Sequence, residues 1–372
     1  MMNHLHITLV GGQSAPVYEG IVYENPDYTI FICSSDTVEI VQRIGAVIDS
    51  PSEHKVISPV NVSEVESYIS SELVPIARQY NKVSVNVTSG TKIWSILFFD
   101  IFKKLDSSEV IYIDQNNVIC DLKKMQNIDY QFTIPDTKRY LEIIGHNVIK
   151  CKKLEEFNQD DLRVAEQIEE IRKFDISEFN NLTKYLNSHP NVQEYTTNKG
   201  SLIKYDTLEK SFSIKVAKRN GTSREWKIKS PNAKYLLLNT GWFELKVAQI
   251  LSKWQYSKEI ILNCEFINKG GATKNEVDII MNTGTKLMFV ECKTQVYNST
   301  DMDKFATVIR NYGGLSTSRI LITYEKIKES VLEKCNESGI LTFSLNGNNH
   351  IADPTTMLYL KLEYEWLKIN PK

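Results

Sequence analysis

The first 135 residues alternate short apolar runs with stretches in which apolar residues recur at helical spacing. We expect five strands here, at 5–10, 28–33, 55–60, 82–88 and 109–114. Helical spacing occupies 36–48 and 63–80, and in the second stretch Ser63 precedes Glu66 at the spacing of a capping box. Such alternation predicts a mostly parallel sheet that is covered by helices.

Residues 136–210 have a different pattern, because helical spacing dominates and charged residues are frequent. Asp136 is a candidate N-cap of a short helix that ends near Gly145. Longer helical patterns follow at 162–174 and 176–186. We interpret this region as a largely helical connector.

From residue 211 onward strands return, and the expected strands are 211–217, 225–229, 277–281, 287–292, 319–323 and 340–343. Helices are expected from Gly241, over 302–312 and over 327–335. The chain is therefore expected to be an α/β protein with an N-terminal Rossmann-like domain at 1–135, the connector at 136–210 and a C-terminal α/β domain at 211–372.

The two apolar strands around Asn282-Thr283-Gly284-Thr285 are expected to form a hairpin. A two-residue or four-residue loop places Asp278 opposite Phe289 and one diagonal step from Glu291, at about 7–8 Å between Cα atoms. Because strand side chains alternate with period two, Asp278, Glu291 and Lys293 then share one face. A three-residue loop would break this arrangement.

An acid and a lysine at the end of a buried strand need partners, and simple pairing of Glu291 with Lys293 is the structural alternative. The order of Asp278, Glu291 and Lys293 also resembles the PD-(D/E)xK nuclease motif. The resemblance implies phosphodiester hydrolysis with Mg²⁺ or Mn²⁺, held by Asp278, Glu291 and the main-chain carbonyl of Cys292. Lys293 would orient the attacking water or contact the phosphate.

Two further residues are candidates for the same site. Glu244 borders the apolar stripe of the helix that starts at Gly241, and many PD-(D/E)xK nucleases have a helix glutamate that assists the motif residues. A surface salt bridge is the alternative for Glu244. Gln295 lies two positions beyond Lys293, so it is expected on the same face.

In the N-terminal domain, the loops that follow parallel strands are where a ligand is expected. The candidate contacts are small or polar residues: Gly12, Gln13, Ser14, Ser35, Thr88, Ser89, Gly90, Thr91 and Lys92. No GxGxxG motif follows the first strand, which argues against an NAD enzyme. No GxxxxGK[ST] motif occurs in the chain, which argues against a P-loop ATPase. The segment Thr88–Lys92 precedes an apolar helix, and the N–H groups at the helix start, the hydroxyl groups and the lysine could bind a phosphate. The alternative is a plain strand-to-helix turn without a ligand.

The segment 86–95, NVTSGTKIWS, resembles the N-x-T-G-G-T-K segment of CRISPR-associated Rossmann-fold (CARF) domains, with Ser89 in place of the first glycine. A CARF-like domain before a PD-(D/E)xK domain resembles the CRISPR ancillary nucleases of type III systems. That resemblance implies a homodimer that binds cyclic tetra-adenylate or hexa-adenylate and then cleaves RNA or DNA. Two alternatives stay open: a restriction-type or repair-type endonuclease without nucleotide activation, and a nonenzymatic ligand-sensing regulator.

Composition adds little to this interpretation. Hydrophobic and charged fractions of 42% and 24% are those of a soluble globular protein. A net charge of −2 argues against a nonspecific nucleic-acid coat and is compatible with an enzyme that has a local basic groove. Six cysteines without a CxxC argue against a zinc site. The sequence has no signal peptide and no long apolar run, so we expect a cytoplasmic protein without membrane contact.

Six basic residues lie close together around the turn at Asn220-Gly221, and they are candidates for contacts to the backbone of a nucleic acid. A solvated hairpin surface is the alternative. The residues are Lys215, Lys218, Arg219, Arg224, Lys227 and Lys229.

Overall fold

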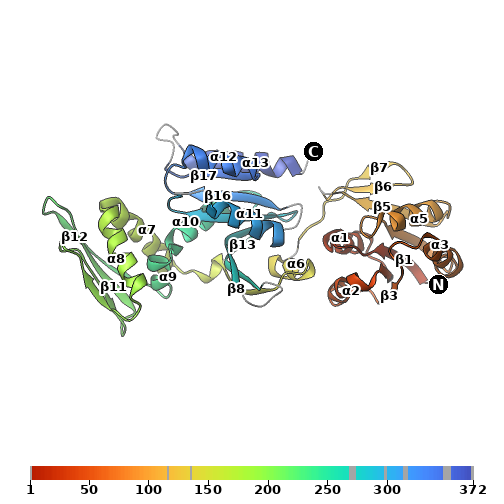
Figure 1. Ribbon diagram of the computed structural model, residues 1–372, viewed down its shortest axis with the longest axis horizontal. Coiled ribbons are helices and arrows are strands. Elements are labelled where there is room, and N and C mark those ends of the chain that lie inside the picture. Colours follow the sequence, from red (N-terminus) through yellow and green to blue (C-terminus); the bar gives the residue numbers. More distant parts are fainter. Residues whose placement is uncertain are drawn as a thin grey trace.

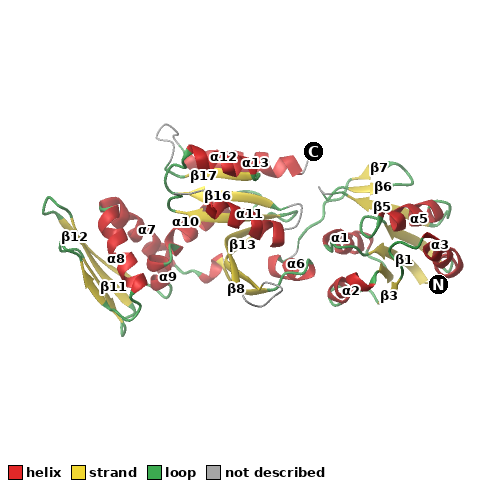
Figure 2. Cartoon of the chain, viewed as in Figure 1, coloured by secondary structure: helices red, strands yellow, loops and turns green. Residues whose placement is uncertain are grey.

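The computed structural model describes residues 2–114, 117–134, 136–267, 274–296, 300–312, 317–346 and 353–369. Over these residues the strands form a seven-stranded, a four-stranded and a six-stranded sheet. The six-stranded sheet lies between the other two along the chain's longest axis (Figure 1), and helices flank all three (Figure 2). No described helix combines the length and apolar character that are needed to span a bilayer.

The N-terminal sheet has the strand order β3-β2-β1-β4-β5-β6-β7. Its elements are β1 (Met2–Leu9), α1 (Ala15–Glu24), β2 (Tyr28–Cys33), α2 (Val38–Gly45), β3 (Ser52–Val56), β4 (Tyr80–Asn86), α5 (Lys92–Phe102), β5 (Ser108–Ile113), β6 (Ile119–Asp121) and β7 (Gln126–Ile128). The first five strands pair in parallel and the last two are antiparallel additions. The expected mostly parallel sheet is therefore confirmed.

Three local expectations in this domain were wrong. The third strand is β3, an exposed edge strand at Ser52–Val56, and not the apolar run 55–60. Helix α1 was not predicted, because Gly20 interrupts its helical pattern; a side chain at Gly20 would collide with the Asn86 amide at 2.3 Å. Asn61, and not Ser63, caps the next helix, because its side chain accepts the N–H of Glu64.

The predicted single helix at 63–80 is in fact three segments. Helix α3 (Val62–Tyr68) passes into a π-helical turn (Ile69–Leu73) and then into the short helix α4 (Val74–Ala77). Pro75 stands in the first turn of α4, where proline is tolerated because first-turn N–H groups have no partner within the helix. The segment still covers one face of the sheet, through the buried residues Val65, Ile69 and Leu73.

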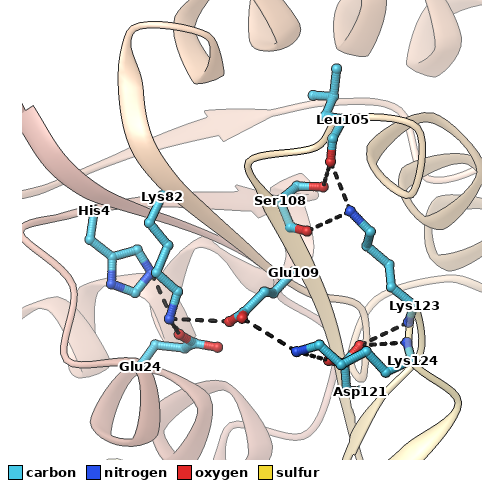
Figure 3. A network of polar contacts seen from close by, with 9 residues as sticks. All are labelled: His4, Glu24, Lys82, Leu105, Ser108, Glu109, Asp121, Lys123 and Lys124. Carbon is cyan, nitrogen blue, oxygen red and sulfur yellow. Dashed lines mark hydrogen bonds and ion pairs between the residues drawn. The ribbon is translucent and has the colours of Figure 1, made fainter.

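A chain of ion pairs joins the antiparallel strands to the parallel part of this sheet (Figure 3). Lys82 on β4 lies 2.8 Å from Glu24 and 3.1 Å from Glu109 on β5. Lys124 lies 2.9 Å from Asp121, whose carboxylate also accepts main-chain N–H groups of the turn after β6. Glu24 is almost fully buried, so its charge depends on Lys82.

The middle of the chain contains the helices that were expected. It also contains strands that the sequence did not reveal. Asp136 caps α6 (Thr137–Ile143) as predicted, and α7 (Gln159–Phe174) and α8 (Ile176–Ser188) agree with the helical patterns. However, β8 (Val148–Lys153) is an edge strand of the six-stranded sheet. The four-stranded sheet consists of β9 (Glu194–Thr196) and β10 (Leu202–Asp206), which were not predicted, and of β11 (Ser211–Ala217) and β12 (Ser223–Lys229), which confirm the strands expected at 211–217 and 225–229. The expected domain limit at residue 211 thus falls between two paired strands.

The six-stranded sheet has the order β17-β16-β15-β14-β13-β8. Its further elements are α9 (Ala233–Leu238), α10 (Gly241–Ser252), β13 (Glu259–Ile267), β14 (Lys274–Asn282), β15 (Leu287–Lys293), α11 (Thr300–Tyr312), β16 (Ser318–Thr323), α12 (Glu329–Glu337), β17 (Ile340–Ser344) and α13 (Pro354–Ile369). One face packs against α7, α9, α10 and α13, and the other against α11 and α12. The second apolar cluster continues through α6 into α1 and α2 of the N-terminal domain.

Candidate functional site

Strands β14 and β15 form the predicted hairpin, but in a different register. Ile280 pairs with Phe289 and Ile279 with Val290, so Asp278 is next in line with Glu291 and not opposite Phe289. The loop begins at Thr283 because Asn282 stays in the strand, where it pairs with Leu287. The error of two residues leaves the face unchanged, since side chains alternate with period two.

The three motif side chains converge at the end of this hairpin. The Lys293 ammonium lies 2.6 Å from Glu291 Oε1 and 3.9 Å from Asp278 Oδ2. The main-chain N–H of Cys292 donates to Asp278 Oδ2 at 2.7 Å. Asp278 and Glu291 expose 14% of their side chains and Lys293 exposes 37%, so the cluster lies where the buried strand reaches solvent.

The charges in this cluster act strongly on one another. Burial, followed by the negative charge of Glu291, raises the pKa of Asp278 to about 7, although Lys293 and the Cys292 N–H oppose the shift. Burial alone would lower the pKa of Lys293, but the carboxylates of Asp278 and Glu291 outweigh it and raise that pKa. Lys293 is therefore a permanent cation, and the two acids repel each other.

The donor set suits a hard divalent cation. Two carboxylates and the Cys292 carbonyl offer oxygen atoms, which Mg²⁺ and Mn²⁺ prefer, and a cation between the acids would relieve their repulsion. The Cys292 thiol is buried in the apolar cluster on the α10 face of the sheet, and burial raises its pKa. Among the described residues no three His, Cys, Asp or Glu side chains gather as a metal site, so the set depends on two side chains and one main-chain oxygen.

Glu244 faces this cluster from α10 and does not form a surface salt bridge. Its side chain is buried, and the Tyr235 hydroxyl donates a hydrogen bond to Oε2. Burial and then the charge of Asp278 raise the pKa of Glu244 to about 8, which places the two acids in one electrostatic environment. Trp242 and Phe243 pack against Tyr324 and so fix the start of α10 beneath the sheet.

Gln295 does not share the strand geometry of the motif residues. Strand β15 ends at Lys293, so the period-two rule does not extend to Gln295, which is exposed. Sequence reasoning instead missed Glu276, which lies two residues before Asp278 on the same strand. Burial and the charge of Asp278 raise the pKa of Glu276. Strand alternation could not have placed it, because Val277 and Ile279 pack in different apolar clusters.

In the N-terminal domain the predicted ligand loops meet at one edge of the sheet. They follow β1, β2 and β4, which are neighbouring parallel strands. Ser89 donates to the Gln13 carbonyl at 3.0 Å, and a Cβ on Gly11 would lie 2.4 Å from the Gly90 nitrogen. Thr37 donates to the Val10 carbonyl at 3.2 Å and so holds the β2 loop beside the β1 loop.

The predicted contacts divide into residues that build these loops and residues that face outward. Thr88 donates to Asn86 and accepts the Ile113 N–H, and Thr91 caps α5. Ser14 and Ser89 are buried, and Gly90 has the left-handed φ of +89°. The outward-facing candidates are Gly12, Gln13, Ser35 and Lys92.

Four of the six basic residues of the β11–β12 hairpin have partners within the fold, two in ion pairs and two over an aromatic ring. Lys215 lies 3.7 Å from Glu225, and Lys227 lies 2.6 Å from Glu209. Lys218 and Arg224 stand over the ring of Phe174. These contacts favour the solvated hairpin surface over a nucleic-acid groove.

Comparisons with known proteins identify the family of both the N-terminal and the C-terminal part of the chain. Residues 5–143 match the family described as the Card1 CARF domain, and residues 232–352 match the Card1-like endonuclease domain. No curated protein matches the chain.

Three solved structures have a similar fold. Can2 from Sulfobacillus thermosulfidooxidans, in complex with cyclic tetra-adenylate, has a TM-score of 0.71 at 19% identity, over 98% of this chain and 99% of its own. Protein VC1899 from Vibrio cholerae has a TM-score of 0.72 at 15% identity, over 98% of both chains. A type III CRISPR defence DNA nuclease activated by cyclic oligoadenylate has a TM-score of 0.62 at 15% identity, over 100% of this chain and 52% of its own.

Proposed function

Since the chain belongs to the Card1 family, with a Card1 CARF domain followed by a Card1-like endonuclease domain, we propose that it is a metal-dependent nuclease activated by cyclic oligoadenylate in type III CRISPR defence. The observation that carries this proposal is the convergence of Asp278, Glu291 and Lys293 at the end of one hairpin. Single-stranded RNA or DNA and supercoiled DNA are the candidate substrates.

The residues of the site suit phosphodiester hydrolysis. Asp278, Glu291 and the Cys292 carbonyl would hold Mg²⁺ or Mn²⁺, and such a cation supplies an acidified water and charge neutralisation at the phosphate. Lys293 keeps its positive charge because the two acids raise its pKa, so it contacts the phosphate or orients the water. No side chain of the site forms a covalent bond to the substrate.

The proposed activator is cyclic tetra-adenylate, which is the ligand in the Can2 structure of similar fold. Main-chain N–H groups at the start of α5, together with Lys92, favour a phosphate at this edge. Gly12 leaves open space, since a Cβ there would meet no atom within 4 Å. These features support a ring that rests on the loops.

We also propose that the chain acts as a homodimer. On helix α5, Ile96 is 65% exposed one turn after Lys92, and its neighbours Ile93 and Leu97 are only partly buried. Apolar side chains that gather at a surface beside a ligand loop are typical of a contact with another protein surface. A second copy would place two sets of ligand loops around one ring.

The test is cleavage of single-stranded RNA, single-stranded DNA and supercoiled plasmid by the purified full chain. Each substrate is incubated with Mn²⁺ or Mg²⁺, with and without cyclic tetra-adenylate or hexa-adenylate. We expect metal-dependent cleavage that rises on addition of one ring. Equal cleavage with and without every ring would favour the restriction-type or repair-type nuclease, and ring binding without cleavage would favour the nonenzymatic regulator.

A further inference from the structure

Glu244 is held by two residues that no motif contains. The Tyr235 hydroxyl, from α9, donates to Glu244 Oε2 and lies 3.1 Å from Asn263 Oδ1 on β13. We propose that Tyr235 and Asn263 are positioning residues that hold the Glu244 carboxylate toward Asp278 and so set the affinity of the site for its divalent cation. This inference rests on the proposed nuclease function.

The register of the sheet places Asn263 beside the motif. Leu262 pairs with Ile279 and Cys264 pairs with Val277, so Asn263 stands in line with Asp278 on the neighbouring strand. Asn263 is buried and adopts a left-handed φ of +53°. Asparagine adopts this conformation more readily than most residues, and inside a strand it bends the backbone locally beside the motif.

The start of α10 is shaped to admit the Tyr235 ring. A Cβ on Gly241 would lie 2.3 Å from Cζ of that ring, so only glycine lets the ring lie against the first turn. The preceding residue, Thr240, has a left-handed φ of +61°. The backbone at Thr240 is therefore unfavourable on its own.

The hydrogen bonds of Tyr235 suit a residue that orients the Glu244 carboxylate. A phenol has one proton, so donation to Glu244 leaves its oxygen to accept from the Asn263 amide, whose nitrogen and oxygen exchange places in a simple flip. A buried carboxylate without a donor is costly, and Tyr235 supplies this donor to Glu244. Partners of this kind fix the rotamer of an acid that lies beside a metal site, without contacting the metal.

The test compares Tyr235→Phe with the unchanged protein in calorimetric titrations with Mn²⁺ and in single-turnover cleavage. We expect the dissociation constant for Mn²⁺ to rise about 10-fold and cleavage to recover at higher Mn²⁺. Asn263→Gly keeps the left-handed backbone while removing the amide, so it should weaken Mn²⁺ binding in the same direction.

Two controls separate positioning from general stability. Tyr359→Phe removes a hydroxyl that donates to the Ile250 carbonyl at 2.6 Å, on the same helix as Glu244 but at its far end, and should leave Mn²⁺ binding unchanged. In a Glu244→Gln background, Tyr235→Phe should add no further loss, because both changes act through one carboxylate.

Three results would overturn the inference: unchanged Mn²⁺ affinity in Tyr235→Phe, an equal loss in Tyr359→Phe, or full additivity with Glu244→Gln. If the unchanged protein cleaves no substrate while Tyr235→Phe still weakens Mn²⁺ binding, the proposed function fails and the positioning role stands.

Discussion

The main-chain N–H of Ile134 donates a hydrogen bond to the carbonyl oxygen of Gly284 at 2.5 Å. Ile134 belongs to the segment that leaves the N-terminal sheet, and Gly284 lies in the turn of the hairpin that carries Asp278 and Glu291. The Asn282 amide donates back to the Ile134 carbonyl at 3.3 Å, and Asn117 donates to the Thr285 carbonyl at 3.3 Å. The N-terminal domain thus holds the turn between the two strands of the candidate site.

This contact predicts that Asn282→Ala uncouples activation from ligand binding. The buried side chain donates to Ile134 and accepts the Gly284 N–H at 2.7 Å, so its loss removes one of the three hydrogen bonds to the N-terminal domain and loosens the turn itself. We expect the ratio of activated to basal cleavage to fall about 10-fold, which corresponds to about 1.4 kcal/mol of coupling. Cyclic tetra-adenylate binding, measured by calorimetry, should not change.

Asn220→Ala is the matched control, because Asn220 also accepts a turn N–H, from Thr222 at 3.1 Å, in the distant β11–β12 hairpin. Unreduced activation in Asn282→Ala, or an equal reduction in Asn220→Ala, would contradict the coupling role of the turn.

A second prediction concerns pH and the junction between α1 and α6. Glu19 is buried and accepts a hydrogen bond from the Tyr140 hydroxyl at 3.2 Å, and burial raises the pKa of Glu19 to about 7. The Glu19 carboxyl group loses its proton near pH 4.5 in the unfolded chain but only near pH 7 in the folded chain. The folded state is therefore favoured below pH 4.5, and this contribution to the free energy of unfolding is lost as the pH rises through 7. The loss is at most about 3 kcal/mol.

Glu19→Gln should flatten this dependence and raise the free energy of unfolding at pH 8. Chemical denaturation at pH 5 and pH 8 measures both effects. A variant that loses stability with pH as steeply as the unchanged protein would show that another group is responsible.

A third prediction separates the two glycines of the first ligand loop. Gly11→Ala places a Cβ 2.4 Å from the Gly90 nitrogen, so we expect about 1–3 kcal/mol lower stability together with weaker ring binding. Gly12→Ala meets open space, so stability should change by less than about 0.5 kcal/mol while ring binding weakens. Thermal unfolding and calorimetry with cyclic tetra-adenylate measure the two quantities, and equal stability losses would contradict the packing argument.

A fourth prediction concerns the buried carboxylate of Glu24. Lys82→Met removes its 2.8 Å partner and leaves a nearly unexposed charge, which should cost about 2–3 kcal/mol. Lys104→Met breaks a pair of similar length with Asp100 on the exposed side of α5, and there the change should be far smaller. Denaturant midpoints of the two variants give the comparison, and equal shifts would show that burial of Glu24 is not decisive.

Sequence patterns were most informative where a period determines the side-chain face. Alternation along β14 and β15 placed Asp278, Glu291 and Lys293 together, and it did so despite a register error of two residues. The error arose because Asn282 is held in its strand by Ile134, a contact between residues far apart in the chain.

The features that the sequence did not reveal depend on tertiary contacts. Strand β3 is exposed at every position, so it has no apolar run to recognise. Asn263 is bent into a left-handed conformation inside an ordinary apolar strand, and Tyr235 reaches Glu244 only because Gly241 leaves room for its ring. Neither position has a local pattern that would have indicated its place in the site.

The most direct measurement compares Glu291→Ala and Lys92→Ala in one Mn²⁺-dependent cleavage assay, paired with calorimetric binding of cyclic tetra-adenylate. We predict that Glu291→Ala abolishes cleavage and binds the ring normally, and that Lys92→Ala binds the ring more weakly and needs more of it for full cleavage. Undiminished cleavage by Glu291→Ala would contradict the account, because no hydrolytic centre could then depend on the cluster of Asp278, Glu291 and Lys293.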